Sequence, residues 1–318
     1  MIAAPSGVPV VDLTGLRERD PAALRRIAAE IGAAARDIGF FSVVNHGIPR
    51  AQLDEMFATA KAFFALPLAA KEEVALDRSR FYRGYARIGF EKLDPTLAGD
   101  AKESYNLGPE LAPDDPDVVA GTQGLNQWPA LPGFREALLA YYDACLALVV
   151  DLHRAVAIDL AAGEEYFSPF FARAQGVLRL LRYPPHPGTF DGTLYGAGPH
   201  TDYGNITLLA QDDAGGLELR RRDGTWLGVP PVADAFVCNI GDCLMRWSND
   251  VYVSNLHRVV NSSGRERYAI AFFGDPAFDA LVACLPSCAT ADRPARYAPI
   301  TYADHLRMKY EATYVAAE

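Results

Sequence analysis

Hydrophobic positions in the first part of the chain follow two different spacings. Residues 8–13 (VPVVDL) and 40–45 (FFSVVN) are short runs rich in β-branched and aromatic side chains, which predicts two buried strands. Between residues 21 and 37, apolar side chains recur every three or four positions, which predicts an amphipathic helix. The same spacing predicts a second helix over residues 49–64. The chain therefore begins with alternating strands and helices.

The middle of the chain is different, because residues 77–130 show no regular period and are rich in glycine, proline and aspartate. Only residues 103–107 (ESYNL) resemble a strand there. Irregular segments of this length are commonly functional or mobile. A long amphipathic helix is predicted next, over residues 132–162.

From residue 177 the pattern becomes that of short strands separated by glycine-containing turns. The predicted strands cover residues 177–183, 206–211, 217–220, 236–240, 254–260 and 268–273. Short strands at this spacing are typical of a sandwich or a closed barrel. We expect the mostly helical N-terminal half to pack against this β half as one unit.

The composition and net charge of the chain indicate which kinds of partner and which cellular location to expect. The chain has 318 residues, of which 50% are hydrophobic and 22% charged, as in a globular protein. Its net charge of -10 repels phosphate backbones, so nucleic acid is not an expected partner. No apolar run approaches the ~20 residues that span a bilayer, and the N-terminus does not resemble a signal peptide. Five cysteines without C-x-x-C spacing indicate free thiols, so a cytoplasmic location is expected.

The candidate chemistry lies in the β half. His200 and Asp202 are two residues apart, so on an extended segment they face the same side, and His257 falls in another predicted strand. Two imidazoles and one carboxylate suit a non-haem Fe(II) oxygenase, since they leave coordination positions open. A zinc hydrolase could use the same ligands, and affinity order would favour zinc. Arg267 supplies a fixed positive charge for an acidic cosubstrate.

Long stretches around these residues resemble a known family. They are GPHTDYGNITLLAQDDAGGLEL, WLGVPPVADAFVCNIGDCLMRWSNDVYVSNLHRVVN and GRERYAIAFFGDP, together with VPVVDL and GFFSVVNHGIP near the N-terminus. They are similar to the Fe(II)/2-oxoglutarate-dependent dioxygenases of the isopenicillin N synthase-like family, over roughly residues 8–315. The resemblance implies a mainly β fold with flanking helices. Its double-stranded β-helix (jelly-roll) core would cover residues 171–290, between a mostly helical region (1–170) and a C-terminal helix (291–318), in a single compact unit (1–318).

The resemblance also implies the site. Iron would be held by His200, Asp202 and His257, with Arg267 and Tyr183 contacting the cosubstrate 2-oxoglutarate. The expected reaction consumes O2, releases succinate and CO2, and hydroxylates, desaturates or cyclises a small molecule, in the setting of secondary metabolism. Ascorbate is expected to help the reaction in vitro.

Two positions depart from the family pattern. Ala269 stands where the family's Arg-x-Ser motif has serine, and Leu181 stands where its Asn-x-Tyr motif has asparagine. A lost hydrogen bond to a charged group costs ~1.5–3 kcal/mol, so cosubstrate binding could be weaker or be supported by another group. Two alternatives therefore stay open, a 2-oxoglutarate-independent Fe(II) oxidase and a non-catalytic metal- or 2-oxoglutarate-binding sensor.

Substrate contacts are expected from regions that border the pocket in the resembling family. The candidates are Phe81, Arg83, Tyr85, Tyr105 and Tyr203, with Arg83 a candidate partner for a substrate carboxylate. The simpler interpretation is that the aromatic residues belong to the core and that Arg83 is solvated. The sequence defines neither the substrate nor the oligomeric state.

Overall fold

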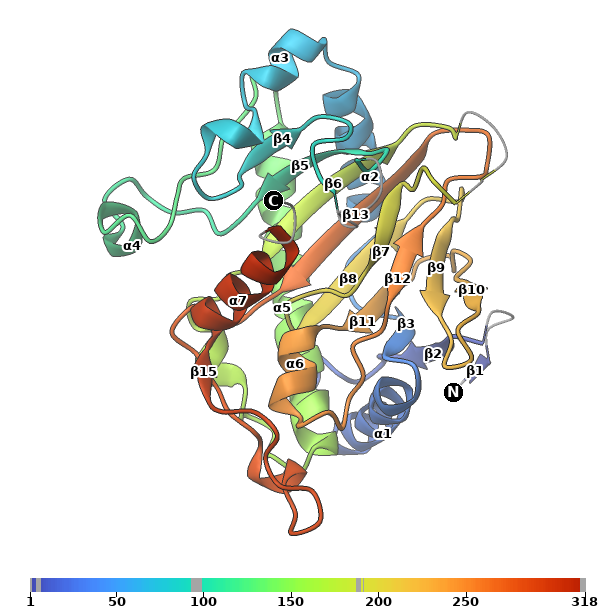
Figure 1. Ribbon diagram of the computed structural model, residues 1–318, viewed down its shortest axis with the longest axis vertical. Coiled ribbons are helices and arrows are strands. Elements are labelled where there is room, and N and C mark those ends of the chain that lie inside the picture. The colour runs from blue at the N-terminus through green and yellow to red at the C-terminus, as the bar shows by residue number, and fades with distance from the viewer. Residues whose placement is uncertain (1, 4–6, 93–98, 187–189, 191, 315–318) are drawn as a thin grey trace.

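Two β-sheets lie face to face at the centre of the protein, and helices cover the outer face of the larger one (Figure 1). The structure is a computed structural model that describes residues 2–3, 7–92, 99–186, 190 and 192–314. Within these residues the larger sheet has nine strands and the smaller has four. This is the mainly β, helix-flanked architecture that the sequence predicts.

The larger sheet combines strands from both halves of the chain. Its order is β1 (Ile2–Ala3), β2 (Pro9–Asp12), β3 (Phe40–Val44), β11 (Phe236–Ile240), β8 (Ile206–Gln211), β13 (Arg267–Gly274), β6 (Val177–Tyr183), β5 (Glu103–Leu107) and β4 (Gly84–Ala86). The smaller sheet has the order β10 (Trp226–Gly228), β9 (Leu217–Arg220), β12 (His257–Val259) and β7 (Ala197–His200). A separate pair joins β14 (Leu281–Val282) to β15 (Ile300–Thr301).

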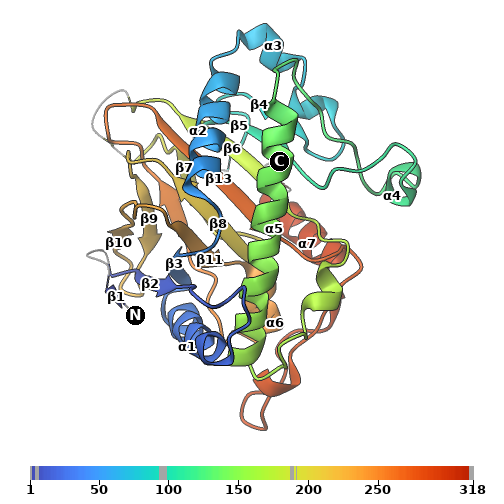
Figure 2. The ribbon, with the colours of Figure 1, turned by 180° about the vertical axis from the view of Figure 1, so that it is seen from behind.

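Helices α1 (Pro21–Asp37), α2 (Arg50–Phe64) and α5 (Phe134–Asp159) lie across the back of the larger sheet (Figure 2). The remaining helices are α3 (Leu68–Glu72), α4 (Pro116–Val119), α6 (Asp242–Trp247) and α7 (Tyr302–Tyr314), with 3-10 turns at Leu76–Arg78, Ser168–Phe171 and Pro286–Cys288. No described helix is both long enough and apolar enough to cross a membrane.

Strand β13 shows why the site lies between the two sheets. Its alternate side chains point to opposite faces. Ile270 and Phe272 join the core under the helices, whereas Ala269 and Ala271 join a second core between the sheets. A fully buried side chain of the Leu or Phe type contributes ~1.5–3 kcal/mol, so both faces stabilise this central strand. Small alanines on the inner face fill less of the volume between the two sheets than larger side chains would.

The predicted elements are largely confirmed. The helix over Pro21–Asp37 and the strands Glu103–Leu107 and Val177–Tyr183 have the predicted bounds. The strand predicted over residues 254–260 is shorter, since only His257–Val259 is paired. The segment 77–130 is less irregular than expected, because it also contains β4 and α4. The C-terminal helix begins at Tyr302.

Candidate metal centre

Three side chains from separate segments converge at one end of the smaller sheet. His200 is the last residue of β7, and His257 is the first residue of the neighbouring β12. The two histidines are directly paired across these antiparallel strands, and their ring centroids lie 4.2 Å apart. Asp202 follows just beyond the end of β7. One ligand atom from each residue falls within 4.8 Å of the others, which is close enough to hold one ion.

Backbone carbonyls orient both imidazoles. The Nδ1 atom of His200 lies 2.7 Å from the Gly198 carbonyl oxygen, and Nδ1 of His257 lies 3.2 Å from that of Asn255. A carbonyl can only accept a hydrogen bond, so each Nδ1 carries the proton and each Nε2 keeps its lone pair. Both Nε2 atoms face Oδ1 of Asp202, at 3.8 Å and 3.7 Å. Burial, and then the neighbouring His257, lower the pKa of His200 to about 3, which keeps it neutral.

The carboxylate of Asp202 is oriented by two side chains from the larger sheet. Its Oδ2 accepts hydrogen bonds from Thr207 Oγ1 at 2.5 Å and from Asn239 Nδ2 at 2.7 Å. Burial would raise the pKa of Asp202, but His257, His200 and these two donors together lower it. The group is therefore a carboxylate whose Oδ1 faces the two imidazoles. Two nitrogens and one oxygen in this arrangement are a ligand set for Fe(II) or zinc.

A buried guanidinium lies between the same two sheets. Arg267, the first residue of β13, is fully buried, and its Nε donates to the Gly215 carbonyl at 2.6 Å. Its Nη2 donates to Oε1 of Gln211 at 3.3 Å, and its Cζ lies 4.7 Å from the ring centroid of Tyr183. Nη1 is buried and has no hydrogen-bond partner among the residues that the structure describes. An orphaned donor on a buried cation fits a carboxylate ligand, as 2-oxoglutarate would supply.

The two departures from the family pattern lie side by side. Ala269 is paired with Leu181 on one side and with Gln211 on the other. The missing serine and the missing asparagine are thus replaced by an apolar pair. The side chain of Gln211 lies next to this pair: its Oε1 accepts from Arg267 and its Nε2 donates to the Val229 carbonyl at 3.4 Å. We expect this amide to take over the role of the serine.

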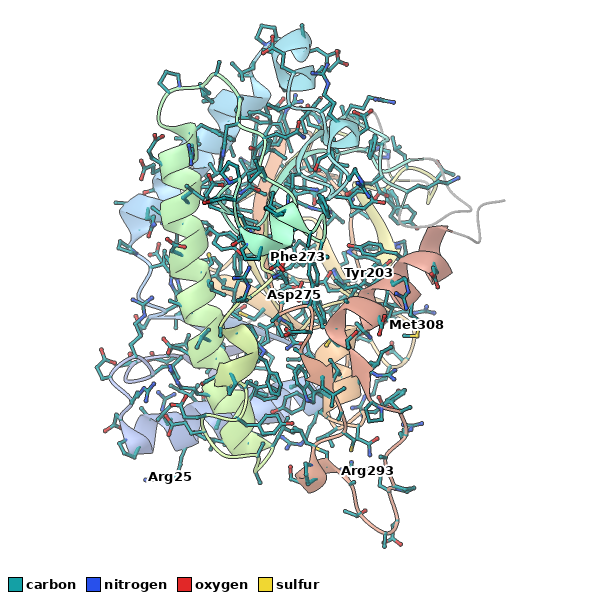
Figure 3. All side chains as sticks on the ribbon, turned by 90° about the vertical axis from the view of Figure 1, so that its left-hand side faces the viewer. Arg25, Tyr203, Phe273, Asp275, Arg293 and Met308 are labelled. Carbon is teal, nitrogen blue, oxygen red and sulfur yellow. The ribbon has the colours of Figure 1, made fainter. Side chains whose placement is uncertain are left out.

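The structure brings the predicted ligands together but divides the predicted substrate residues. Tyr85 and Tyr105 do not reach the site: they pack in the core under the helices, and their hydroxyls bond Glu103 and the Gln127 carbonyl. The physical reason is the alternation of β5, which turns Ser104 and Asn106, and not Tyr105, toward the inner face. Tyr203 and Asp275 lie beside α7 (Figure 3).

Tyr203 packs against helix α7, whereas Phe81 packs against the segment that contains Gly124. The Tyr203 ring meets the ring of Tyr310 on α7 edge-on, at 5.7 Å. Phe81 packs against Gly124, whose Cβ position would be 2.2 Å from the Phe81 ring. Arg83 is buried, contrary to the interpretation that it is solvated.

Sequence reasoning did not identify Thr207, Asn239 and Gln211, which orient Asp202 and Arg267. These residues could have been recognised from the sequence, because each is a polar side chain at an inner-facing position of an otherwise apolar strand. It also missed the buried ion pairs of Lys102 with Asp100 at 2.8 Å and Glu91 at 3.1 Å. Asp100 Oδ1 accepts a hydrogen bond from the Gly198 backbone, so this cluster supports the strand that carries His200.

Comparison with known protein families gives matches in both halves of the chain. Residues 8–131 match the family described as "non-haem dioxygenase in morphine synthesis N-terminal". Residues 174–276 match the 2OG-Fe(II) oxygenase superfamily, and this range contains all three candidate ligands and Arg267.

Individual relatives match over nearly the whole chain. The 2-oxoglutarate-Fe(II) type oxidoreductase hxnY of Emericella nidulans is 39% identical, covering 99% of this chain and 93% of the relative. A full-length Neurospora crassa protein, solved in complex with alpha-KG and thymine, superposes with a TM-score of 0.87 at 32% identity, covering 99% of each chain. A putative 2OG-Fe(II) oxygenase family protein of Caulobacter crescentus superposes with a TM-score of 0.86 at 34% identity, covering 96% of this chain and 99% of the other.

Proposed function

Because this chain belongs to the 2OG-Fe(II) oxygenase superfamily, we propose that it hydroxylates a small organic molecule at the centre formed by His200, Asp202 and His257. The overall reaction converts substrate, 2-oxoglutarate and O2 into hydroxylated product, succinate and CO2. The chain is a 2-oxoglutarate-Fe(II) oxidoreductase by family.

The observation that supports this function is the presence of two groups between the sheets: the ligand triad, and the buried guanidinium of Arg267, whose Nη1 has no hydrogen-bond partner among the described residues. The triad alone would equally suit a zinc hydrolase. Arg267 adds a buried cation whose Nη1 has donors left for a ligand. A zinc hydrolase does not need such a cation, whereas a dicarboxylate cosubstrate needs one to pair with its far carboxylate.

Each group then has a physical task. Bound Fe(II), O2 and 2-oxoglutarate supply the oxidising power that breaks the substrate C–H bond. His200, Asp202 and His257 hold the metal on one side and leave its other positions open. Arg267 holds the far carboxylate of the cosubstrate, with the ring of Tyr183 against its guanidinium. The second core between the sheets excludes water from this space.

An anaerobic titration tests this function directly. Adding Fe(II) and then 2-oxoglutarate to the purified protein is expected to produce a weak visible charge-transfer band, and admitting O2 is expected to release succinate. Succinate release distinguishes this enzyme from a 2-oxoglutarate-independent oxidase, and turnover distinguishes it from a non-catalytic sensor. Absence of both the band and 2-oxoglutarate binding would refute the proposal.

A second prediction concerns the orientation of Asp202. Thr207→Val removes one donor to Oδ2 and keeps the size of the side chain, so the carboxylate can rotate away from the imidazoles. Metal affinity, measured with Mn(II) by electron paramagnetic resonance, is expected to fall ~10–100-fold. Thr207→Ser is expected to restore it. Thr201→Val is the matched control, because that hydroxyl bonds Asp242 instead; an equal loss there would contradict a specific role for Thr207.

The proposed setting is secondary metabolism in the cytoplasm. All five cysteines are free thiols, as is usual in a reducing compartment. The similar Neurospora crassa protein was solved in complex with thymine, which supports a small-molecule substrate.

A further inference from the structure

Arg83 is a buried cation for which the described residues supply no ion pair. Its side chain is only 7% exposed, yet in the part of the chain that the structure describes its guanidinium has no hydrogen bond or ion pair. The other buried cations are satisfied at least in part. Lys71 pairs with Glu103 and Lys102 with Asp100, both at 2.8 Å, and Arg267 makes two hydrogen bonds. A buried guanidinium whose Nε has no acceptor is costly in the free protein.

The fold makes room for this side chain. The Cβ atom of any residue other than glycine at position 108 would lie 1.9 Å from Cζ of Arg83. Gly108 directly follows β5, and its backbone is fixed by Asn126, which bonds both its N–H and its carbonyl. The guanidinium thus packs directly against the backbone of Gly108, a position where any other residue would clash with it. Arginine stays charged there, although burial lowers its pKa.

Aromatic side chains lie around Arg83 and next to the segment that carries Asp202. Arg83 interacts electrostatically with Tyr142 on α5 and with Tyr310 on α7. The Tyr310 ring contacts that of Tyr203, which directly follows the ligand Asp202. On its outer side Tyr310 stacks on Tyr82, and both rings are substantially exposed. The positive charge of Arg83 therefore lies among aromatic side chains, one of which contacts the residue that follows Asp202.

We propose that Arg83 binds the carboxylate of the organic substrate, so that the substrate is a small carboxylic acid with an apolar or aromatic body. This inference rests on the proposed function. The guanidinium matches a carboxylate with two parallel hydrogen bonds, and a single unpaired cation matches a single negative charge. Arg267 takes the cosubstrate, which leaves Arg83 for the molecule that is oxidised. The bound acid offsets the desolvation cost that Arg83 carries in the free enzyme.

The first test compares acids with their uncharged amides. Benzoate, phenylacetate and cinnamate, each beside its primary amide, are titrated into the Fe(II)- and 2-oxoglutarate-loaded enzyme without O2. Calorimetry is expected to show at least one acid binding ten or more times more tightly than its amide. In Arg83→Met this preference is expected to vanish, and in Arg83→Lys to return in part. Gly108→Ala, which keeps the charge but displaces it, is expected to weaken the preference as well.

The second test needs no ligand. If the role of Arg83 is to bind substrate, Arg83→Met removes an unpaired buried charge from the free protein. The melting temperature of the protein without metal, cosubstrate or substrate is then expected to rise by about 2 °C or more. A structural role predicts a lower melting temperature. Arg87→Met is the matched control, because Arg87 lies four residues away with an exposed side chain; it is expected to change neither acid preference nor melting temperature.

The outcomes separate this inference from the proposed function. Arg83→Met is expected to keep the Fe(II)/2-oxoglutarate charge-transfer band unchanged. The inference is overturned if no acid binds more tightly than its amide to the wild type, or if Arg83→Met retains the preference. A wild type without the band would refute the proposed function, while the acid and amide titrations would still decide the role of Arg83.

Discussion

An Asp202→Ala protein is expected to lose Fe(II) binding and to release succinate at least about a thousandfold more slowly than the wild type. Asp202 supplies the only carboxylate oxygen of the triad, and both imidazole Nε2 atoms face it. Without it, two neutral nitrogens remain, and the positive charge of the metal is not offset. Metal content after dialysis and succinate release at saturating 2-oxoglutarate measure the two effects.

The fold should survive this change, which makes the result interpretable. Asp202 is a desolvated charge, so its removal eliminates a burial cost together with two hydrogen bonds. Asp213→Ala is the control, since Asp213 is exposed and forms an ion pair with Arg265 at the surface. If Asp202→Ala retained iron and turnover, the metal would have to lie elsewhere in the protein.

The sequence identifies the ligands because their residue types and spacing are visible in short stretches of chain. That they converge on one point depends on strand pairing, which those stretches do not specify. His200 and Asp202 are neighbours, and the residues around His257 have β propensity. The sequence does not predict β7 itself, because Ala197–His200 contains glycine and proline and has little propensity of its own. It becomes a strand because β12 pairs with it. Tertiary pairing thus overrides local preference at the metal centre.

The orientation of β5 shows a second limit of sequence reasoning. All five of its residues are buried, so no polar–apolar alternation tells which ones face the site. Tyr105 is a natural substrate candidate by sequence, but it lies in the aromatic core with Phe63 and Phe134. The burial of Arg83 is equally non-local, since it depends on Gly108 and on residues of α5 and α7. Such placements follow from packing across the fold and not from any nearby pattern.

Arg267→Gln is expected to raise the dissociation constant of 2-oxoglutarate about 100-fold while leaving metal affinity unchanged. Loss of the buried charge removes two charge-assisted hydrogen bonds to the cosubstrate carboxylate, worth together about 3 kcal/mol. Anaerobic titration of the charge-transfer band measures the constant. Arg265→Gln is the matched control, because Arg265 precedes the same strand but pairs with Asp213 at the surface. An unchanged constant in Arg267→Gln would remove Arg267 from cosubstrate binding.

The same titration shows what replaces the missing serine. Ala269 lies two residues after Arg267 on the same face of β13 and directly beside Gln211. If the Gln211 amide already supplies the hydrogen bond, Ala269→Ser adds little, and we expect the dissociation constant to change less than about threefold, well under 1.4 kcal/mol. Gln211→Leu is then expected to weaken 2-oxoglutarate binding, because it removes that amide and the hydrogen bond to Arg267. A tenfold gain from Ala269→Ser would instead show that the apolar pair of Ala269 and Leu181 leaves the cosubstrate carboxylate one donor short.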